Sequence, residues 1–217
     1  GESAKQFKTQ LDTNTDDTVE NDINEIEDNL VEKINVDHIL YDHHYYNNSI
    51  KTILVIVENY IKTNELILVG GMAIDLALRT KGEHIYDDNE LPDYDIISDD
   101  NLKHAQTLGH ILCMNGYENI RVMSAIHVTT VRIKYKDATV FDATYVPTIL
   151  YNKIPTLESK GFKIIHPHYQ KIDQYNSLSY LMEKTGENAN IFNRLKKDIN
   201  RNKLLVDVFP FELTTSI

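Results

Sequence analysis

The chain changes from a strand pattern to a helix pattern across two adjacent glycines, and this change limits the folds open to it. Residues 65–69 form a short apolar run of strand length that ends in Gly70 and Gly71. Residues 72–79 then place their apolar side chains at helical spacing. Because a strand that turns directly into a helix belongs to a sheet covered by helices, the pattern predicts an α/β or α+β domain rather than a helical bundle.

Other apolar patterns extend this unit into a larger sheet. Alternating or continuous apolar runs predict strands over residues 93–98, 119–123, 127–135 and 139–144. Apolar residues at steps of three and four predict helices over residues 19–34, 48–62, 102–112, 172–182 and 189–205. We therefore expect an α+β (mixed α/β) fold with a central mixed sheet, N-terminal helices and a C-terminal helical flank.

These patterns also suggest how the chain is divided into regions. We expect a flexible N-terminus, an N-terminal helical region, a sheet-bearing core and a C-terminal helical flank, over residues 1–17, 18–64, 65–160 and 161–217. The acidic helix of the second region has a single apolar stripe. That stripe can pack on the chain's own core or on a second copy, so a homodimer is one expectation.

Charge is distributed unevenly along the 217 residues. The formal net charge is −11, and residues 1–45 alone contain twelve Asp and Glu side chains against three Lys side chains. The C-terminal region has the opposite balance, with a basic cluster formed by Arg194, Lys196, Lys197, Arg201 and Lys203. This cluster either receives a polyanion or forms the solvated face of an ordinary helix, and charge alone leaves both interpretations open.

The apolar content gives no sign of a membrane segment. No uninterrupted apolar run approaches the ~20 residues that cross a bilayer, so we expect no membrane association. The single cysteine, Cys113, lies among apolar residues and is predicted to be a buried thiol. One cysteine excludes an internal disulfide and fits a reducing compartment.

An acid-x-acid pair in the second predicted strand is the sharpest chemical feature. Because side chains two positions apart on a strand point to the same face, Asp93 and Asp95 are expected to project together. Two such close charges require a divalent cation or a raised pKa. Oxygen ligands without histidine or thiolate favour Mg²⁺ or Mn²⁺ over zinc. Such a pair alone is also common at solvated strand edges.

Two further features accompany the acid pair. Gly70 and Gly71 expose backbone N–H groups and the positive end of a helix dipole to a phosphate, although two glycines can also simply make a tight turn. Asp142 lies in an otherwise apolar strand, where a carboxylate without a partner is costly. If that strand neighbours the strand of Asp95, three carboxylates converge. Three carboxylates around two Mg²⁺ ions ~4 Å apart can carry out in-line phosphoryl or nucleotidyl transfer.

Three other polar residues receive structural interpretations. Asp75 follows the glycines on the predicted helix and is interpreted as an acid of its first turn, favoured there by the helix dipole. His166 and His168 flank Pro167 in a predicted loop and are expected to be structural.

Together, Gly70-Gly71, Asp93-x-Asp95 and Asp142 resemble the motifs of the nucleotidyltransferase superfamily of DNA polymerase β and the poly(A) polymerases. Within it, the chain is similar to the poly(A) polymerase catalytic subunits of large DNA viruses, on the evidence of residues 68–73, 91–96, 171–173 and 194–201. The resemblance implies an inserted loop over residues 80–91, because compact members have a shorter interval there. Since the viral enzymes carry a further domain, it also implies that this chain is part of a longer protein.

The resemblance implies Mg²⁺-dependent (or Mn²⁺-dependent), template-independent addition of AMP from ATP to RNA 3′ ends, with release of pyrophosphate. It implies that Asp93 and Asp95 hold two ions and that Asp142 holds the ion that activates the RNA 3′-hydroxyl. The implied nucleotide-binding residues are Gly70, Gly71, Lys196, Lys197 and Arg201. A viral origin would place the protein in the cytoplasm of the infected cell or in the virion.

Two other functions stay open at this point. One is nucleotidyl transfer to another acceptor, such as tRNA, a small molecule or a protein. The other is a non-catalytic, nucleotidyltransferase-like scaffold or RNA-binding subunit. The presence of all three aspartates favours an enzyme over the scaffold.

Overall fold

The computed structural model describes residues 47–87, 90–182 and 189–211. The chain divides into two units, Gly1–Ser49 and Ile50–Ile217. The flexible N-terminus and the acidic helix predicted over residues 1–17 and 19–34 lie outside the described residues. The strands, and the helices from residue 70 onward, belong to the second unit.

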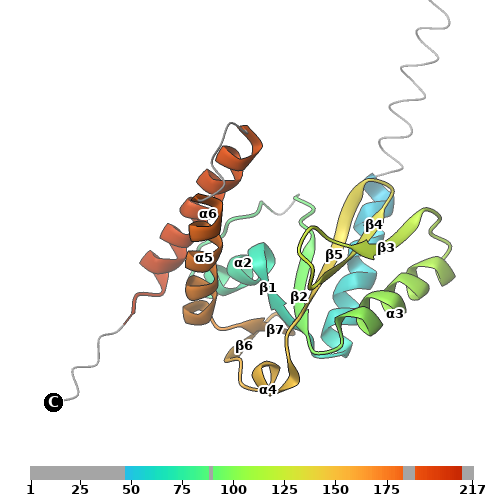
Figure 1. Cartoon of the computed structure of the whole chain (residues 1–217), viewed down its shortest axis with the longest axis horizontal. Coiled ribbons are helices and arrows are strands. Elements are labelled where there is room, and N and C mark those ends of the chain that lie inside the picture. Colours follow the sequence, from blue (N-terminus) through green and yellow to red (C-terminus); the bar gives the residue numbers. More distant parts are fainter. Residues whose placement is uncertain (1–46, 88–89, 183–188, 212–217) are drawn as a thin grey trace, which may run out of the picture. The chain divides into compact units, whose positions relative to one another are not determined.

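A seven-stranded sheet runs through the second unit in the order β3-β4-β5-β2-β1-β7-β6 (Figure 1). Its strands are β1 (Ile67–Val69), β2 (Tyr94–Ser98), β3 (Ile120–Ser124), β4 (Thr130–Tyr135), β5 (Ala138–Tyr145), β6 (Thr156–Ser159) and β7 (Phe162–Ile165). The β2–β5 and β1–β7 pairs are parallel, and the other four pairs are antiparallel. The mixed sheet confirms the predicted fold class.

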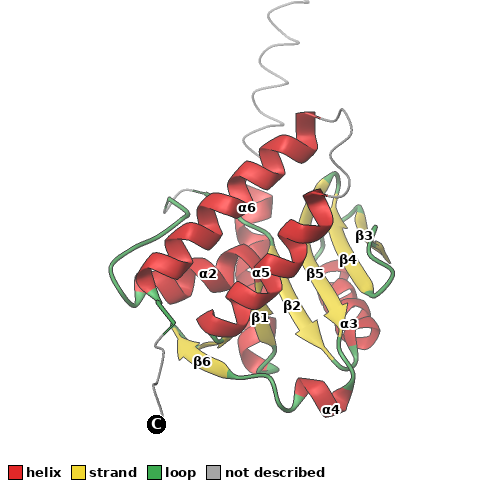
Figure 2. Cartoon of the chain, turned by 60° about the vertical axis from the view of Figure 1, so that its left-hand side comes forward, coloured by secondary structure: helices red, strands yellow, loops and turns green. Residues whose placement is uncertain are grey.

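The sheet is flanked by helices. They are α2 (Gly70–Arg79), α3 (Asn101–Met114), α4 (Thr148–Tyr151), α5 (Pro167–Met182) and α6 (Ala189–Val208), together with the helix over residues 47–63. Helix α3 contacts β3, β4 and β5, whereas α2 contacts β1, β2 and β7. Figure 2 shows α5 and α6 lying side by side, and both contact α2. In the part of the chain that the structure describes, no helix is long and apolar enough to cross a membrane.

The core follows the periodicity of the sequence. The helix over residues 47–63 fully buries Ile53, Val57 and Ile61, which are spaced by four positions. From the sheet, Ile96 and Phe141 have no exposed surface. Each side chain of this size stabilises the fold by roughly 1.5–3 kcal/mol when it is buried.

Three elements differ from the sequence prediction. The β6–β7 hairpin and α4 were not predicted, and because β7 pairs with β1, the sheet continues beyond residue 160. Cys113 is exposed, so the prediction of a buried thiol is wrong: α3 buries Ala105, Leu108 and Leu112 instead, and Cys113 lies next to that face.

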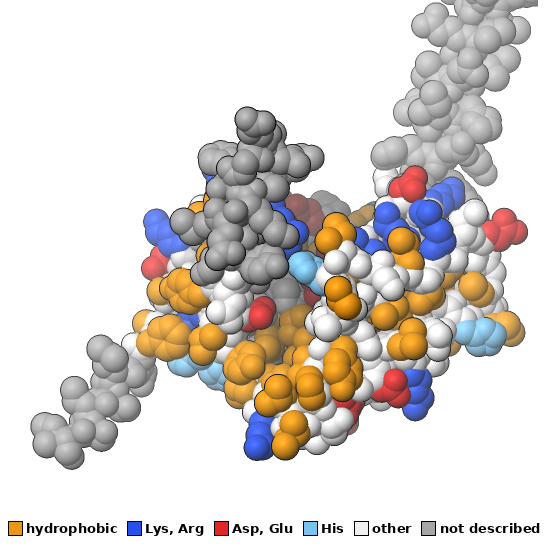
Figure 3. All heavy atoms as spheres, viewed as in Figure 1, with side chains coloured by type: hydrophobic (Ala, Val, Ile, Leu, Met, Phe, Trp, Pro, Cys, Tyr) orange, Lys and Arg blue, Asp and Glu red, His pale blue; other side chains and the backbone are white. Residues whose placement is uncertain are grey.

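Helix α4 exposes Ile149 and Leu150, and Figure 3 shows hydrophobic side chains gathered around it.

Candidate active site

The double glycine connects β1 to α2 without an intervening loop. Helix α2 begins at Gly70 itself, two residues earlier than the apolar spacing indicated. Gly70 has a φ of 69°, in the left-handed region that glycine adopts without steric cost. No side chain caps the start of α2. Its first backbone N–H groups therefore depend on a partner from outside the helix.

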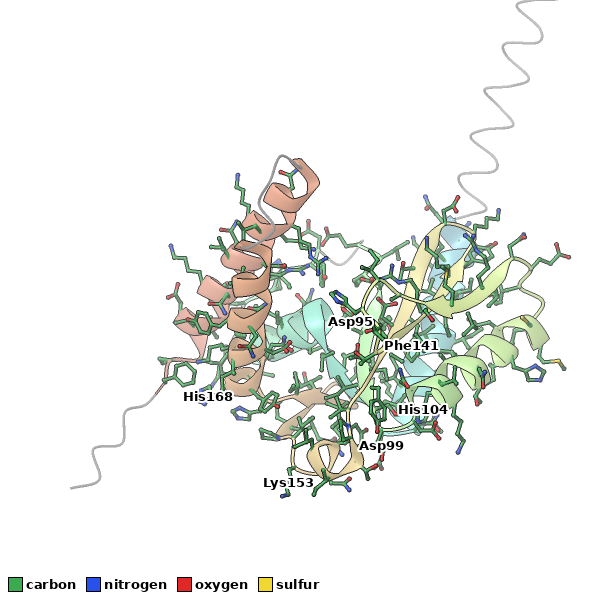
Figure 4. The ribbon with its side chains drawn as sticks, viewed as in Figure 1. Asp95, Asp99, His104, Phe141, Lys153 and His168 are labelled. Carbon is green, nitrogen blue, oxygen red and sulfur yellow. The ribbon has the colours of Figure 1, made fainter. Side chains whose placement is uncertain are left out.

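The acid pair lies where β2 begins, but only one member belongs to the strand. Strand β2 starts at Tyr94, so the prediction that Asp93 is a strand residue is wrong; Asp93 follows Pro92 and immediately precedes the strand. Asp95 is the second residue of β2 and lies between two paired strands. Figure 4 shows Asp95 on the sheet, beside α2.

Strand register places Asp95 in a row of functional groups that crosses the sheet. Asp95 is the register partner of Val69 on one side and of Asp142 on the other, and Asp142 is the register partner of Arg132. Side chains of register partners in neighbouring strands share a face of the sheet. The register thus brings the side chains of Asp95, Asp142 and Arg132 to one level of the sheet. The end of β1 at Val69, which leads into Gly70, lies at the same level.

Tyr94 fixes the same strand from the opposite face. Its hydroxyl donates a hydrogen bond of 2.5 Å to Oε1 of Glu58, on the helix over residues 47–63. Its ring stacks on Phe162, with the ring centroids 6.1 Å apart. Because neighbouring strand residues face opposite sides, these contacts hold the beginning of β2 while leaving Asp95 on the other face.

The turn and the carboxylate are in close contact. A Cβ atom added to Gly70 would overlap Oδ2 of Asp95. Gly70→Ala is therefore expected to destabilise the protein by about 2–4 kcal/mol, because it combines the cost of a positive φ with overpacking. Chemical denaturation of the parent and the variant measures the difference.

Gly82→Ala is the matched control for this prediction. Gly82 has a φ of 85°, and a Cβ atom there would meet nothing within 4 Å. The control contains the backbone cost, about 1–2 kcal/mol, without the overlap. Equal destabilisation by both substitutions would contradict the close contact between Gly70 and Asp95.

The three carboxylates act on one another electrostatically. Burial, followed by the charges of Asp93 and Asp142, raises the pKa of Asp95 from its ordinary value of 3.8 to about 7. Burial and then Asp142 also raise the pKa of Asp93. Arg132 opposes both shifts. The cluster therefore stores unfavourable negative charge, which a cation would relieve.

Asp142 already has a cationic partner. Nε and Nη2 of Arg132 donate hydrogen bonds of 2.8 Å and 2.6 Å to the two oxygens of Asp142, which is 7% exposed. This bond, ahead of the other causes, raises the pKa of Arg132. Among the described residues, no three acidic, histidine or cysteine side chains are arranged to hold a metal ion as they stand. The donors themselves are all carboxylate oxygens, which suit Mg²⁺ or Mn²⁺.

Helix α6 brings two of the predicted basic residues toward the cluster. The charge of Lys197 lowers the pKa of Asp93, and that of Arg201 lowers the pKa of Asp95, although both effects are smaller than those of burial. Lys197 and Arg201 lie four positions apart and so share one face of α6. Lys196 and Lys197 are both exposed, but Lys196 comes one position earlier, about 100° around the helix from that face.

Tyr86 links α6 to the glycine turn. Nη2 of Arg201 donates a 2.7 Å hydrogen bond to the Tyr86 hydroxyl, and its guanidinium lies 5.3 Å from the ring centroid. A Cβ atom on Gly71 would overlap that hydroxyl and lie 3.3 Å from Nη2 of Arg201. Tyr86 and Arg201 therefore both pack against the start of α2.

Asp75 holds the backbone of Tyr86 against α2. The interpretation of Asp75 as an acid of the first helical turn is wrong. Asp75 is the sixth residue of α2, outside the first turn, and is 2% exposed. Its Oδ1 accepts hydrogen bonds from the backbone N–H groups of Ile85 and Tyr86, at 2.8 and 3.1 Å, and its Oδ2 accepts one from Arg79 Nε at 2.6 Å. The only sequence signal was an acid on a largely apolar helix with an arginine four positions later.

The two histidines do not join the site. His168 lies near the start of α5, well apart from Asp95 in Figure 4. The rings of His166 and His168 contact each other, with their centroids 5.0 Å apart. The structure thus brings together Gly70, Gly71 and the three predicted aspartates, with Lys197 and Arg201 nearby, and adds Arg132 and Tyr86.

Comparison with known proteins matches residues 55–184 to the poly(A) polymerase catalytic subunit family. A protein of African swine fever virus, assigned by inference as a poly(A) polymerase catalytic subunit, is 37% identical over 161 residues, which is 74% of this chain and 34% of that protein. A mimivirus protein with the same assignment is 25% identical and matches 75% of this chain and 27% of its own length.

A solved structure shares the fold. The crystal structure of the Megavirus polyadenylate synthase superposes with a TM-score of 0.65 at 24% identity, and covers 75% of this chain and 32% of the synthase. The chain thus spans about a third of the length of the relatives that it matches. The family match extends over more than half of the chain and includes the glycine turn, the acid pair and Asp142. The chain therefore belongs to the family of poly(A) polymerase catalytic subunits, which are nucleotidyltransferases.

Proposed function

We propose that this chain carries the nucleotidyl-transfer centre of a template-independent poly(A) polymerase, which adds AMP from ATP to the 3′ end of RNA. The observation that carries the proposal is the register of β2 and β5, which sets Asp95 directly beside Asp142 at the level of the glycine turn. The family membership supports the same reaction. The viral relatives support a location in the infected cell or the virion.

The proposed metal ligands are the carboxylates of Asp93, Asp95 and Asp142. Their donor atoms fit two Mg²⁺ or Mn²⁺ ions. The pKa of Asp95, raised by burial and then by the charges of Asp93 and Asp142, supports a cluster that a cation would stabilise. When bound, such ions neutralise charge on the reacting phosphate and lower the pKa of the attacking hydroxyl. The protein contributes the fixed spacing of Asp95 and Asp142, which β2 and β5 impose, with Asp93 immediately before β2.

The remaining groups are proposed to bind and orient the nucleotide. The uncapped N–H groups at Gly70 and Gly71 suit the triphosphate, and the shared face of Lys197 and Arg201 provides counter-charge. Lys196, exposed beside that face, is proposed to contact the RNA backbone. Arg201 is held in place by its hydrogen bond to Tyr86.

The reaction exchanges one phosphoester bond for another. The RNA 3′ oxygen forms a bond to the α-phosphorus of ATP while the bond from that phosphorus to the pyrophosphate oxygen breaks, and the hydroxyl proton passes to solvent. Positioning and charge neutralisation supply most of the rate enhancement. A homodimer would rest on the acidic helix predicted over residues 19–34, which lies outside the described residues.

A nucleotide-extension assay tests the proposal. The purified chain is incubated with Mg²⁺, a short 5′-labelled RNA and each of the four nucleoside triphosphates separately. We expect stepwise lengthening of the RNA with ATP and none when EDTA replaces Mg²⁺. Transfer of AMP to tRNA or to a small molecule, with the single-stranded RNA left unextended, would show a different acceptor. No transfer with any nucleotide would contradict the proposed function.

A further inference from the structure

Arg132 is a cationic side chain that pairs directly with the carboxylate cluster. Its guanidinium binds both oxygens of Asp142 at 2.6 and 2.8 Å, and its charge also lowers the pKa of Asp93 and Asp95. The register of β4 and β5 pairs Arg132 with Asp142, so the contact is built into the sheet. Two parallel N–H···O bonds to one carboxylate form a strong, directional pair.

The same contact engages the whole carboxylate of Asp142. Both of its oxygens are engaged, and its side chain is only 10% exposed. This engagement is consistent with the finding that no three described side chains form a ready metal site. The Arg132 side chain, in contrast, is 31% exposed.

We propose that Arg132 is an internal counter-ion that competes with divalent cations for Asp142, so that metal binding and the Arg132–Asp142 pair are alternatives. The proposal rests on the proposed function, since it takes the carboxylate cluster to be the metal site. Arg132 has two effects in this scheme. Without metal, it neutralises the clustered carboxylates and stabilises the fold; when metal binds, the lost pair weakens the observed affinity.

Manganese binding tests the competition directly. The free Mn²⁺ signal in electron paramagnetic resonance gives the dissociation constant for the parent chain and for Arg132→Gln. Because the ion no longer displaces a two-bond charged pair, we expect Arg132→Gln to bind Mn²⁺ about tenfold more tightly. Arg132→Lys, which keeps the charge as a single-point donor, is expected to fall between the two. Unchanged or weaker binding by Arg132→Gln would overturn the proposal.

Arg121→Gln is the matched control. Arg121 also pairs with an aspartate, Asp137, at 3.2 Å, but that aspartate is 99% exposed at a turn. The substitution removes the same charge from the neighbouring strand β3. We expect no change in Mn²⁺ affinity, and a gain equal to that of Arg132→Gln would show a general charge effect and overturn the proposal.

Thermal unfolding provides a second readout that does not depend on measuring affinity. In EDTA, Arg132→Gln is expected to have a lower Tm than the parent, and Mn²⁺ should raise its Tm by more than it raises that of the parent. If Arg132→Gln does not fold in EDTA, Arg132→Lys gives the same comparison. Equal Mn²⁺ shifts in the parent and the variants would overturn the competition.

The effect of Asp95→Asn on Mn²⁺ binding distinguishes a failure of this inference from a failure of the proposed function. If Mn²⁺ binds the parent but not Asp95→Asn, the cluster is the metal site, and equal affinities of the parent and Arg132→Gln then overturn only the role of Arg132. If Mn²⁺ binds the parent and Asp95→Asn equally, the ion lies elsewhere and both proposals fail.

Discussion

Asp95→Ala is expected to reduce the rate of AMP incorporation roughly 1,000-fold. Asp95 lies at the centre of the row that joins the glycine turn to Asp142, with register partners in both β1 and β5. Losing one group that stabilises developing charge costs about 10²–10³ in rate, and a carboxylate proposed to hold both ions belongs at the upper end of that range. Initial rates of labelled ATP incorporation into RNA measure the loss.

The control for this loss is Asp99→Ala. Asp99 directly follows β2 and lies apart from Asp95 in Figure 4. Substitution there removes an equal charge at the opposite end of the same strand, and we expect less than a twofold change. Circular dichroism of both variants establishes that they remain folded. If Asp95→Ala retained a tenth of the parent rate, Asp95 could not hold a catalytic ion.

Local sequence patterns predicted much of this site because its pieces are locally encoded. The apolar run before Gly70, the helix after it and the β4–β5 hairpin around Lys136 all have signals within a few residues. These elements are confirmed. The sequence alone did not determine whether the strand of Asp142 lies beside the strand of Asp95. That pairing is set by packing between distant segments, and the structure provides it.

The missed elements show where local signals are too weak. Each strand of the β6–β7 hairpin has only four residues, and β7 gains its place by parallel pairing with β1, which no local pattern encodes. The two-residue turn at Lys160 and Gly161, with positive φ at both positions, was a usable hairpin signal. Residues 162–165 were predicted to belong to the C-terminal helical flank, although an apolar run of this length fits several structures.

The roles of Arg132 and Asp75 could not be read from the sequence for a related reason. In the alternating pattern of its strand, Arg132 looks like an ordinary solvent-facing residue. Its importance comes from the β4–β5 register, which sets it beside Asp142. Asp75 likewise gains its role from the backbone of Ile85 and Tyr86, which folds back onto α2. A charged residue's partner is fixed by tertiary structure even where its own strand or helix is predictable.

The cost of ionising the buried carboxylate cluster should appear as an unusual dependence of protein stability on pH. The pKa of Asp95 is about 7 in the folded protein against an ordinary value of 3.8. Between these pH values the folded chain keeps a proton that the unfolded chain has lost. The contribution of Asp95 to the free energy of unfolding therefore falls as the pH rises from about 4 to about 7. It should change by on the order of 2–4 kcal/mol.

Asp95→Asn isolates this contribution, because asparagine has a similar shape and does not titrate. In EDTA, urea denaturation at pH 5, 6, 7 and 8 should show the variant gaining stability relative to the parent as the pH rises, with the gain levelling off above pH 7. Asp99→Asn, away from the cluster, should leave the pH profile unchanged. Mg²⁺ should reduce the parent's deficit at pH 8, since the ion favours the ionised carboxylates. Parallel profiles for the parent and Asp95→Asn would mean that Asp95 ionises normally. The expectation, on electrostatic grounds, that the cluster requires a cation would then be wrong.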